Sequence, residues 1–317
     1  MNIENKCNLC GSLNISDVKN YNSIGDLEYG CKLVSCNSCR HYFTYFSKRL
    51  ELEEVYRSGK YKVIDIRRSI FDKLVSLNSS NILWELHRLI DGGKLLDFGC
   101  GKGQFLNQAD KKGWNVIGIE TEKERAEFGK KAYGLNISNS EYKSGRLTSS
   151  PFNVITLFHV LEHLLSPKQL LKELIDNNLS EEGFIVIEVP LFDSVQSKIS
   201  RNKWLHLDPP VHYSHFTRET LLKLLKEVGV EVHKERYFSI QLGILGMVDA
   251  IMKSFGYKKN IIYELKFNRT IPLLITTITV FPIAIIIELL SVLFKKGGVI
   301  RVYGKKMNYE KDITTII

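Results

Sequence analysis

Residues 94–112 combine a short apolar run, a glycine-rich turn and an amphipathic segment in direct succession. The run KLLDFG (94–99) predicts a buried strand, and a helix is expected over about residues 104–112. Between them, the turn GCGKG (99–103) lets the backbone pass close to a bound molecule. The N–H groups at the start of the helix favour a polar or anionic group there. The segment therefore predicts a βα unit with a ligand site at the carboxyl end of its strand.

The same alternation of strands and helices continues to residue 240. Apolar runs predict further strands, and amphipathic segments bounded by capping residues or glycine predict helices between them. The expected strands are 115–120, 136–138, 152–158, 184–190 and 230–240, and the expected helices are 122–134, 167–179 and 218–229. This order predicts an α/β fold with a Rossmann-like doubly wound sheet, whose ligand site lies at the carboxyl ends of the strands.

An acidic residue stands where such a sheet would bind a ribose. Glu120 ends the second strand, 23 residues after Asp97. A carboxylate in this position can accept hydrogen bonds from both ribose hydroxyls, which favours a nucleoside-containing cofactor. The alternative is a plain glycine turn beside a solvated glutamate.

The segments LLDFGCGKG, VIGIE, FNVITLFHVLEHLLSP and GFIVIEVP together resemble motifs I, II, IV and V of class I S-adenosylmethionine-dependent methyltransferases. The resemblance covers roughly residues 90–240 and implies that S-adenosylmethionine is the cofactor. It implies that Gly99 and Gly101 lie against the methionine part, that Asp97 orients that end and that Glu120 holds the ribose. The expected cofactor-binding residues are Asp97, Gly99, Cys100, Gly101, Gly103, Glu120 and His159.

Two histidines are the candidates for acid–base catalysis during methyl transfer. His159 directly follows the fourth strand, where a side chain can face the transferred methyl group. His212 lies in PPVHYSHFT (209–217), which is similar to the HxxYFS stretch of sugar C-methyltransferases, and the resemblance implies a catalytic base at His212. His215 falls where that family usually has tyrosine. The alternative is that both histidines of this segment only close the site.

A third histidine, His163, follows Glu162 in the sequence LEH (161–163). We expect His163 to fix its loop by hydrogen bonding. In ubiquinone-pathway O-methyltransferases a similar Glu-His pair looks like part of a metal site. The other acidic ligands of that site are not evident in this sequence, so the metal of that family is not carried over to this pair.

Two Cys-x2-Cys pairs, formed by Cys7 with Cys10 and by Cys36 with Cys39, are separated by 25 residues. Two such pairs can present four thiolates tetrahedrally, so the spacing predicts a structural Zn²⁺ site of the zinc-ribbon kind. Cys31 has no partner in this scheme, and its role stays open. A redox-active pair and a ribbon without metal are the alternatives. Sugar C-methyltransferases also carry an N-terminal cysteine-ligated zinc module, which strengthens that resemblance.

The segment 241–297 is much more apolar than the rest of the chain, and residues 271–287 carry no charge. The following residues, VIRVYGKK, resemble the last strand of a methyltransferase sheet, which pairs antiparallel with the strand before the segment. Both ends of the segment then emerge on the same side. We therefore expect an interfacial or re-entrant helical hairpin, bent near Pro282. A buried helical subdomain or a dimer interface is the alternative.

Charge distribution bears on the partner of this chain. The net charge is +9, and residues 240–310 hold ten Lys or Arg against four Asp or Glu. Basic residues around an apolar face favour an anionic membrane surface. Residues 1–40 are nearly charge-balanced, which disfavours nucleic acid as the partner of the cysteine module. The polar N-terminus has no apolar signal-peptide core, and we expect a cytoplasmic protein, peripheral or monotopic on the inner face of the membrane.

The sequence thus predicts five regions: a zinc-ribbon-like module (1–50), a helical connector (51–90), the methyltransferase core (91–240), the apolar insertion (241–297) and the last strand with a tail (298–317). The predicted function is methyl transfer to a small-molecule acceptor, above all a sugar or glycan, including a lipid-linked one. The alternatives are a quinone or lipid O-methyltransferase and a non-catalytic membrane adaptor. The acceptor, the methylated atom and the oligomeric state stay open.

Overall fold

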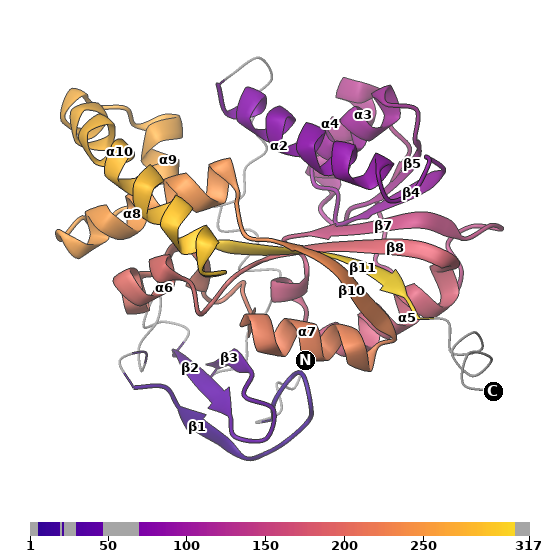
Figure 1. Ribbon diagram of the computed structural model, residues 1–317, viewed down its shortest axis with the longest axis horizontal. Helices are drawn as coiled ribbons and strands as arrows, with labels where there is room; N and C mark the ends of the chain where they lie inside the picture. The colour runs from indigo at the N-terminus through magenta and orange to yellow at the C-terminus, as the bar shows by residue number, and fades with distance from the viewer. Residues whose placement is uncertain (1–5, 20, 22–29, 47–69, 308–317) are drawn as a thin grey trace.

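The computed structural model describes residues 6–19, 21, 30–46 and 70–307. Its centre is a seven-stranded sheet in the order β10-β11-β8-β7-β4-β5-β6 (Figure 1). These strands are β4 (Lys94–Phe98), β5 (Asn115–Ile119), β6 (Ile137–Ser138), β7 (Phe152–Phe158), β8 (Leu179–Pro190), β10 (Val230–Arg236) and β11 (Val299–Lys306). Strands β4 to β8 are parallel, and β11 is antiparallel to both β8 and β10. The expected Rossmann-like sheet is confirmed.

Helices cover both faces of the sheet because neighbouring residues of each buried strand point to opposite sides. In β4, Leu95 packs with the helices of one face, and Leu96 packs with those of the other. The first face carries α2 (Ile70–His87), α3 (Gln104–Lys111) and α4 (Lys123–Tyr133), and the second carries α5 (Pro167–Asn178) and α7 (Arg218–Glu227). The central strands of the sheet are therefore buried on both sides.

Two strand boundaries differ from those expected by more than one residue. Strand β8 begins at Leu179 rather than at residue 184, since Leu179 already pairs with Phe152 of β7. Strand β10 ends at Arg236 rather than at residue 240, because the chain next enters a π-helical turn, η5 (Ile240–Ile244). The start of α7 agrees with expectation, as Thr217 caps the helix through its side chain.

The N-terminal cysteine region forms a second, four-stranded sheet that includes a strand from the core. Strands β1 (Ile15–Asp17), β2 (Cys31–Cys36) and β3 (Tyr42–Phe46) are joined by β9 (Ser214–His215). β9 pairs antiparallel with β3, so the segment that contains His212 runs directly into this sheet. The expected module at residues 1–50 therefore shares its edge with the core. The expected helical connector covers residues 51–90. Its residues 51–69 lie outside the described residues, and its remainder contains α2.

The insertion between β10 and β11 is helical, and both its ends emerge beside paired strands, as expected. After η5 it contains α8 (Leu245–Ser254), α9 (Ile261–Phe267) and α10 (Ile271–Leu293). α10 packs on α8, which packs on α6 (Val195–Ser200). Figure 1 shows the insertion helices grouped beside the sheet, away from α3 and α4. The helix α10 runs through Pro282 without ending, so the chain reverses before α10 and not at this proline.

Helix α10 has one buried face and one exposed apolar face. It is long and apolar enough to cross a membrane by length and composition, and 22% of its most apolar window is buried. The buried face consists of Leu273, Thr277, Ala284, Glu288 and Ser291. The large exposed apolar residues of α10 and its C-cap are Ile271, Leu274, Ile275, Ile278, Phe281, Ile283, Ile286, Leu289, Leu290, Leu293 and Phe294. The charge of Glu288 thus points into the protein and leaves the outer face apolar.

Glu288 fixes this orientation through hydrogen bonds. Its Oε1 accepts from the backbone N–H of Gly298, at 2.9 Å, and its Oε2 accepts from Nε2 of Gln196, at 3.3 Å. Gly298 immediately precedes β11, and Gln196 lies in α6. A fully buried carboxylate therefore connects α10 to the residue that precedes β11.

Candidate functional site

The carboxyl ends of β4 and β5 bring the predicted cofactor residues together. Asp97 is buried near the end of β4, and Glu120 directly follows β5. Glu120 accepts hydrogen bonds from the backbone N–H groups of Gly101 and Glu122, both at 2.8 Å. The space beside Gly101 is open, since a Cβ built there would meet no atom within 4 Å. An open glycine turn held against a carboxylate fits the ribose and methionine ends of S-adenosylmethionine.

The pKa of the Asp97 carboxyl group, at the carboxyl end of β4, is strongly shifted. Burial raises its pKa to about 7, although a 2.7 Å hydrogen bond donated by Thr156 acts in the opposite direction. The neighbouring charge of Glu120 contributes to the same upward shift of the pKa. Near neutral pH the Asp97 carboxyl is therefore ready to become ionised beside a cationic group.

Two other residues of the predicted cofactor set support the turn from within. The Cys100 thiol faces β5, because a Cβ on Gly118 would lie 2.7 Å from its Sγ. Burial raises the pKa of this thiol, so Cys100 shapes the turn as a neutral group. Gly103 has a φ of 74°, and a Cβ there would collide with Leu135 at 2.6 Å. Glycine is needed at this position for both backbone conformation and space.

His159 lies between two buried carboxylates at the end of β7. Its Nδ1 is 3.2 Å from Glu162 and its Nε2 is 3.0 Å from Glu188. Its backbone has a φ of 57°, a left-handed conformation that is costly for a residue other than glycine. Burial alone would lower the pKa of His159, but its hydrogen bonds with the two carboxylates raise it to about 10.

At neutral pH, His159 is therefore an imidazolium with both nitrogens engaged. Such a ring has no lone pair with which to accept a proton, so the geometry does not fit the base role that the sequence suggested. The ring instead holds Glu162 and Glu188 together. The next residue, Val160, packs against the cofactor turn, since its Cγ2 would lie 2.6 Å from a Cβ on Gly99.

Arg301 completes this buried charge network. Its guanidinium forms an ion pair with Glu188 at 2.5 Å, and the two residues are direct cross-strand neighbours in β11 and β8. Neither Glu188 nor Arg301 was among the residues that sequence reasoning selected. The available signal was a single charge in each of two apolar strands, FIVIEVP and VIRVY, with opposite signs.

His163 and His212 come from segments 49 residues apart in the sequence, yet their rings meet edge to face with centroids 4.5 Å apart. His163 lies in the short turn η2 (Leu161–His163), and Nδ1 of its ring is 3.2 Å from the carbonyl of Val211. Burial and, to a smaller extent, the neighbouring His212 lower the pKa of His163 to about 4. His163 is therefore neutral, and its contact with Val211 fixes the loop as expected.

The N-terminal sheet holds the His212 segment in place. Thr44 of β3 donates a 2.7 Å hydrogen bond to the carbonyl of His212, and its backbone N–H donates to the carbonyl of Tyr213 at 3.0 Å. The same Thr44 hydroxyl lies 2.9 Å from Nε2 of His215. Asn8, next to the first cysteine, donates to the Ser214 hydroxyl at 2.7 Å. The position of His212 thus depends on the fold of the cysteine region.

The four predicted zinc ligands lie together. The Sγ atoms of Cys7 and Cys39 are 3.6 Å apart, as are those of Cys10 and Cys36. All four sulfurs lie within 4.8 Å of one another. In a tetrahedral site with Zn–S bonds of about 2.3 Å, sulfur atoms are about 3.8 Å apart, so the cluster fits Zn²⁺. Cys31 is buried elsewhere, in a cluster with Trp204 and Val211.

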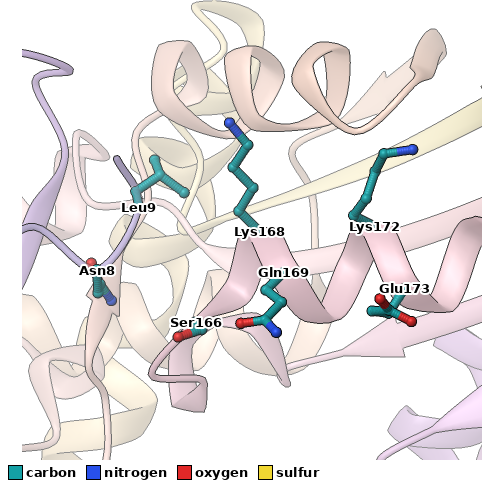
Figure 2. A pocket seen from close by; sticks show the side chains of 7 residues that line it. All are labelled: Asn8, Leu9, Ser166, Lys168, Gln169, Lys172 and Glu173. Atoms are coloured by element: carbon teal, nitrogen blue, oxygen red, sulfur yellow. The ribbon is translucent and has the colours of Figure 1, made fainter. Parts of the chain in front are cut away.

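A separate open cavity of about 400 Å³ lies between the cysteine region and α5 (Figure 2). Its lining residues are Asn8, Leu9, Ser166, Lys168, Gln169, Lys172 and Glu173. Lys168 forms an ion pair with Glu227, and Lys172 forms one with Asp176. These pairings neutralise the two lysines, and we assign no ligand to this cavity.

Comparison with curated proteins finds two relatives over parts of the chain. A probable fatty acid methyltransferase of Mycobacterium tuberculosis is 31% identical over 94 residues, covering 27% of this chain and 22% of that protein. The ubiquinone biosynthesis O-methyltransferase of Acinetobacter baumannii is 26% identical over 115 residues, covering 33% of this chain and 48% of that protein. The chain thus spans about a fifth and about half of the lengths of these relatives.

Two solved structures are similar to this chain at low sequence identity. A SAM-dependent methyltransferase from Archaeoglobus fulgidus is 18% identical, covering 73% of this chain and 94% of that chain with a TM-score of 0.47. The plantazolicin methyltransferase BpumL in complex with SAH is also 18% identical, covering 81% and 91% with a TM-score of 0.48.

The match to a family model is more extensive. A model described as a methyltransferase domain matches residues 70–235, which is just over half of the chain and includes β4 to β10. The matched region contains the glycine turn, Glu120, His159, His163 and His212. The chain therefore belongs to the methyltransferase domain family.

Proposed function

We propose that this protein transfers a methyl group from S-adenosylmethionine to a small acceptor, most specifically a sugar or glycan presented at a membrane surface. The observation that carries the first part is the arrangement of Asp97, the open turn at Gly101 and Glu120 at one edge of the sheet. Glu120 would hold the ribose hydroxyls, and Asp97 would attract the amino group of the methionine end.

When bound, S-adenosylmethionine would supply a sulfonium-activated methyl group. An acceptor atom would attack the methyl carbon in line, and S-adenosylhomocysteine would leave with the electron pair of the broken carbon–sulfur bond. Such a reaction depends mainly on positioning and on the exclusion of water. The chain supplies the positioning through the glycine turn and through the loop at His159, which packs against Gly99 by way of Val160. The neighbouring pair of His163 and His212 would lie on the acceptor side.

Two features support an acceptor at the membrane. The insertion begins after β10 and ends at β11, and Val299 at the start of β11 pairs with Pro190 at the carboxyl end of β8. The helix α10 is thus joined to the sheet at the carboxyl ends of the parallel strands, which is also where the cofactor turn lies. In addition, both curated relatives are named for fatty acid or ubiquinone, which are apolar molecules. A quinone or lipid O-acceptor is the second candidate.

The sugar or glycan acceptor is supported by the segment around His212 and by the cysteine module. Both features resemble those of sugar C-methyltransferases, and the structure holds them in contact through Thr44. We further propose that the four cysteines bind one structural Zn²⁺, which would stabilise the small sheet that braces this segment.

We also propose that α10 lies in the plane of an anionic membrane rather than across it. Its apolar face is exposed from Ile271 to Phe294, along the whole helix, while Glu288 ties the opposite face to the protein. Exposed basic residues surround the insertion at Lys258, Arg269 and Lys295, where lipid headgroups would lie. A helix that lies in the plane of the membrane would place the carboxyl ends of the parallel strands at the membrane surface.

Replacing Glu120 by Ala removes the proposed ribose ligand. We expect S-adenosylmethionine and S-adenosylhomocysteine to bind the wild-type protein at micromolar concentrations in calorimetric titration, and the Glu120→Ala variant at least tenfold more weakly. Glu124→Ala, an exposed change in the first turn of α4, is the matched control and should bind normally. Absence of binding by a folded wild-type protein would refute the proposed activity and favour the non-catalytic adaptor.

Binding of the cofactor should release protons near neutral pH. The pKa of Asp97 is about 7 in the free protein, so about half of these groups are protonated at pH 7. A cationic amino group favours the carboxylate, so binding should expel up to about half a proton at pH 7 and progressively less at higher pH. Titrations in buffers with different ionisation enthalpies measure this number. Asp97→Asn should abolish the release, and equal heats in all buffers would contradict the assignment.

Replacing Cys36 by Ser removes one proposed zinc ligand. Metal analysis should find one Zn²⁺ per wild-type chain and substoichiometric Zn²⁺ in Cys36→Ser. Because Thr44 braces the His212 segment, amide hydrogen exchange in residues 210–217 should become faster in this variant. Cys31→Ser changes an equally buried cysteine outside the cluster and should retain its zinc. Unchanged zinc content in Cys36→Ser would overturn the proposed site.

Vesicle flotation tests the membrane surface. The wild-type protein should bind vesicles that contain phosphatidylglycerol, more strongly than pure phosphatidylcholine vesicles, and binding should weaken in high salt. A double change, Ile278→Glu with Ile286→Glu, places charges on the outer face of α10 and should reduce binding at least tenfold. Leu13→Glu with Leu77→Glu is a control at other exposed leucines. A wild-type protein that forms dimers and does not bind vesicles would instead favour a second copy of the chain as the partner that covers α10.

A further inference from the structure

The cluster formed by Glu162, His163 and His212 has the composition and spacing of a metal-binding site. One potential ligand atom from each side chain lies within 4.8 Å of the others. Glu162 and His163 come from the turn after β7, whereas His212 comes from the segment that the N-terminal sheet braces. The fold therefore gathers one carboxylate and two imidazoles that are far apart in the sequence.

The hydrogen bonds of the two histidines determine which ring nitrogens are available. Nδ1 of His163 is 3.2 Å from the carbonyl of Val211, and Nδ1 of His212 is 2.8 Å from the carbonyl of His206. A carbonyl accepts only, so Nδ1 carries the proton in both rings and Nε2 keeps its lone pair. This is the arrangement found in metal-binding histidines, whose second nitrogen donates to a carbonyl or carboxylate.

The carboxylate of Glu162 has one oxygen without a partner. Its Oε1 contacts Nδ1 of His159, but its Oε2 is buried with no hydrogen-bond partner among the residues that the structure describes, and Glu162 is 1% exposed. A buried carboxylate oxygen without a hydrogen bond is unfavourable, because it has lost its water without replacement. A cation between the three side chains would satisfy this oxygen and both Nε2 lone pairs.

We propose that Glu162, His163 and His212 bind one divalent transition-metal ion on the acceptor side of the cleft. Two imidazoles and one carboxylate suit Zn²⁺, Fe²⁺ or Mn²⁺ better than Mg²⁺ or Ca²⁺, which prefer oxygen ligands alone. The ion is distinct from the zinc of the four cysteines. His159 is then a positioning residue that holds Glu162 from the opposite side.

The role of the ion rests on the proposed methyl transfer, although its binding does not. A bound cation would act as a Lewis acid on an oxygen of the acceptor and favour loss of its proton before the methyl group is attacked. A metal on Nε2 of His212 occupies the lone pair that a catalytic base needs. The two roles of His212 are therefore alternatives, and the metal role also gives the buried oxygen of Glu162 a partner.

Co²⁺ provides the test, added to full-length protein that already holds one Zn²⁺ per chain. We expect one further equivalent to bind with visible absorption bands typical of nitrogen and oxygen ligands and without a sulfur-to-cobalt charge-transfer band. His163→Gln and His212→Gln should each weaken this binding at least tenfold, while their zinc content and S-adenosylhomocysteine binding stay normal. His233→Gln, a histidine of β10 outside the cluster, is the matched control and should bind Co²⁺ like the wild type.

Failure of a zinc-loaded wild-type protein to bind the second equivalent would overturn the proposal. Equal Co²⁺ binding by His163→Gln, His212→Gln and the wild type would also overturn it. The outcome is independent of the proposed function. A protein that binds S-adenosylhomocysteine but no Co²⁺ contradicts the metal site alone, whereas one that binds Co²⁺ but no S-adenosylhomocysteine contradicts the methyl transfer alone.

Discussion

The ion pair between Arg301 and Glu188 connects β11 to the proposed reaction site. Both side chains are buried, and they face each other directly across β11 and β8. Glu188 in turn contacts His159, and His159 contacts Glu162. Removing one member of such a pair leaves a buried charge without compensation, at a cost of about 3–5 kcal/mol. The chain of alternating charges therefore fixes strand register and loop geometry together.

Local sequence patterns predicted the central part of the fold and the cofactor edge well. The run from residue 94 to residue 120 contains a strand, a glycine turn, a helix and a second strand with a terminal glutamate, each of which depends on neighbours close in sequence. The structure accordingly brings Asp97, Gly101 and Glu120 to one edge. The same holds for the two cysteine pairs, whose spacing alone limits the possible geometry.

Residues whose environment comes from distant segments were harder to predict. The position of His159 after β7 was visible, but its charge depends on Glu188, which lies 29 residues further along, and so its chemistry could not be derived locally. The contact between His163 and His212 needs the turn after β7 and the segment before β9 to meet. Similarly, Glu288 looked like an obstacle to lipid contact until its inward hydrogen bond to Gly298 placed it on the protein side of α10.

The sharing of β9 between the two parts of the protein has a consequence for its synthesis on the ribosome. Strands β1 to β3 emerge first, but the edge of β3 is completed by Ser214 and His215, more than 160 residues later. Until then the backbone groups of β3 that face β9 must remain bonded to water or be shielded by another molecule. Folding of the first 46 residues is thus finished only after most of the methyltransferase domain has left the exit tunnel.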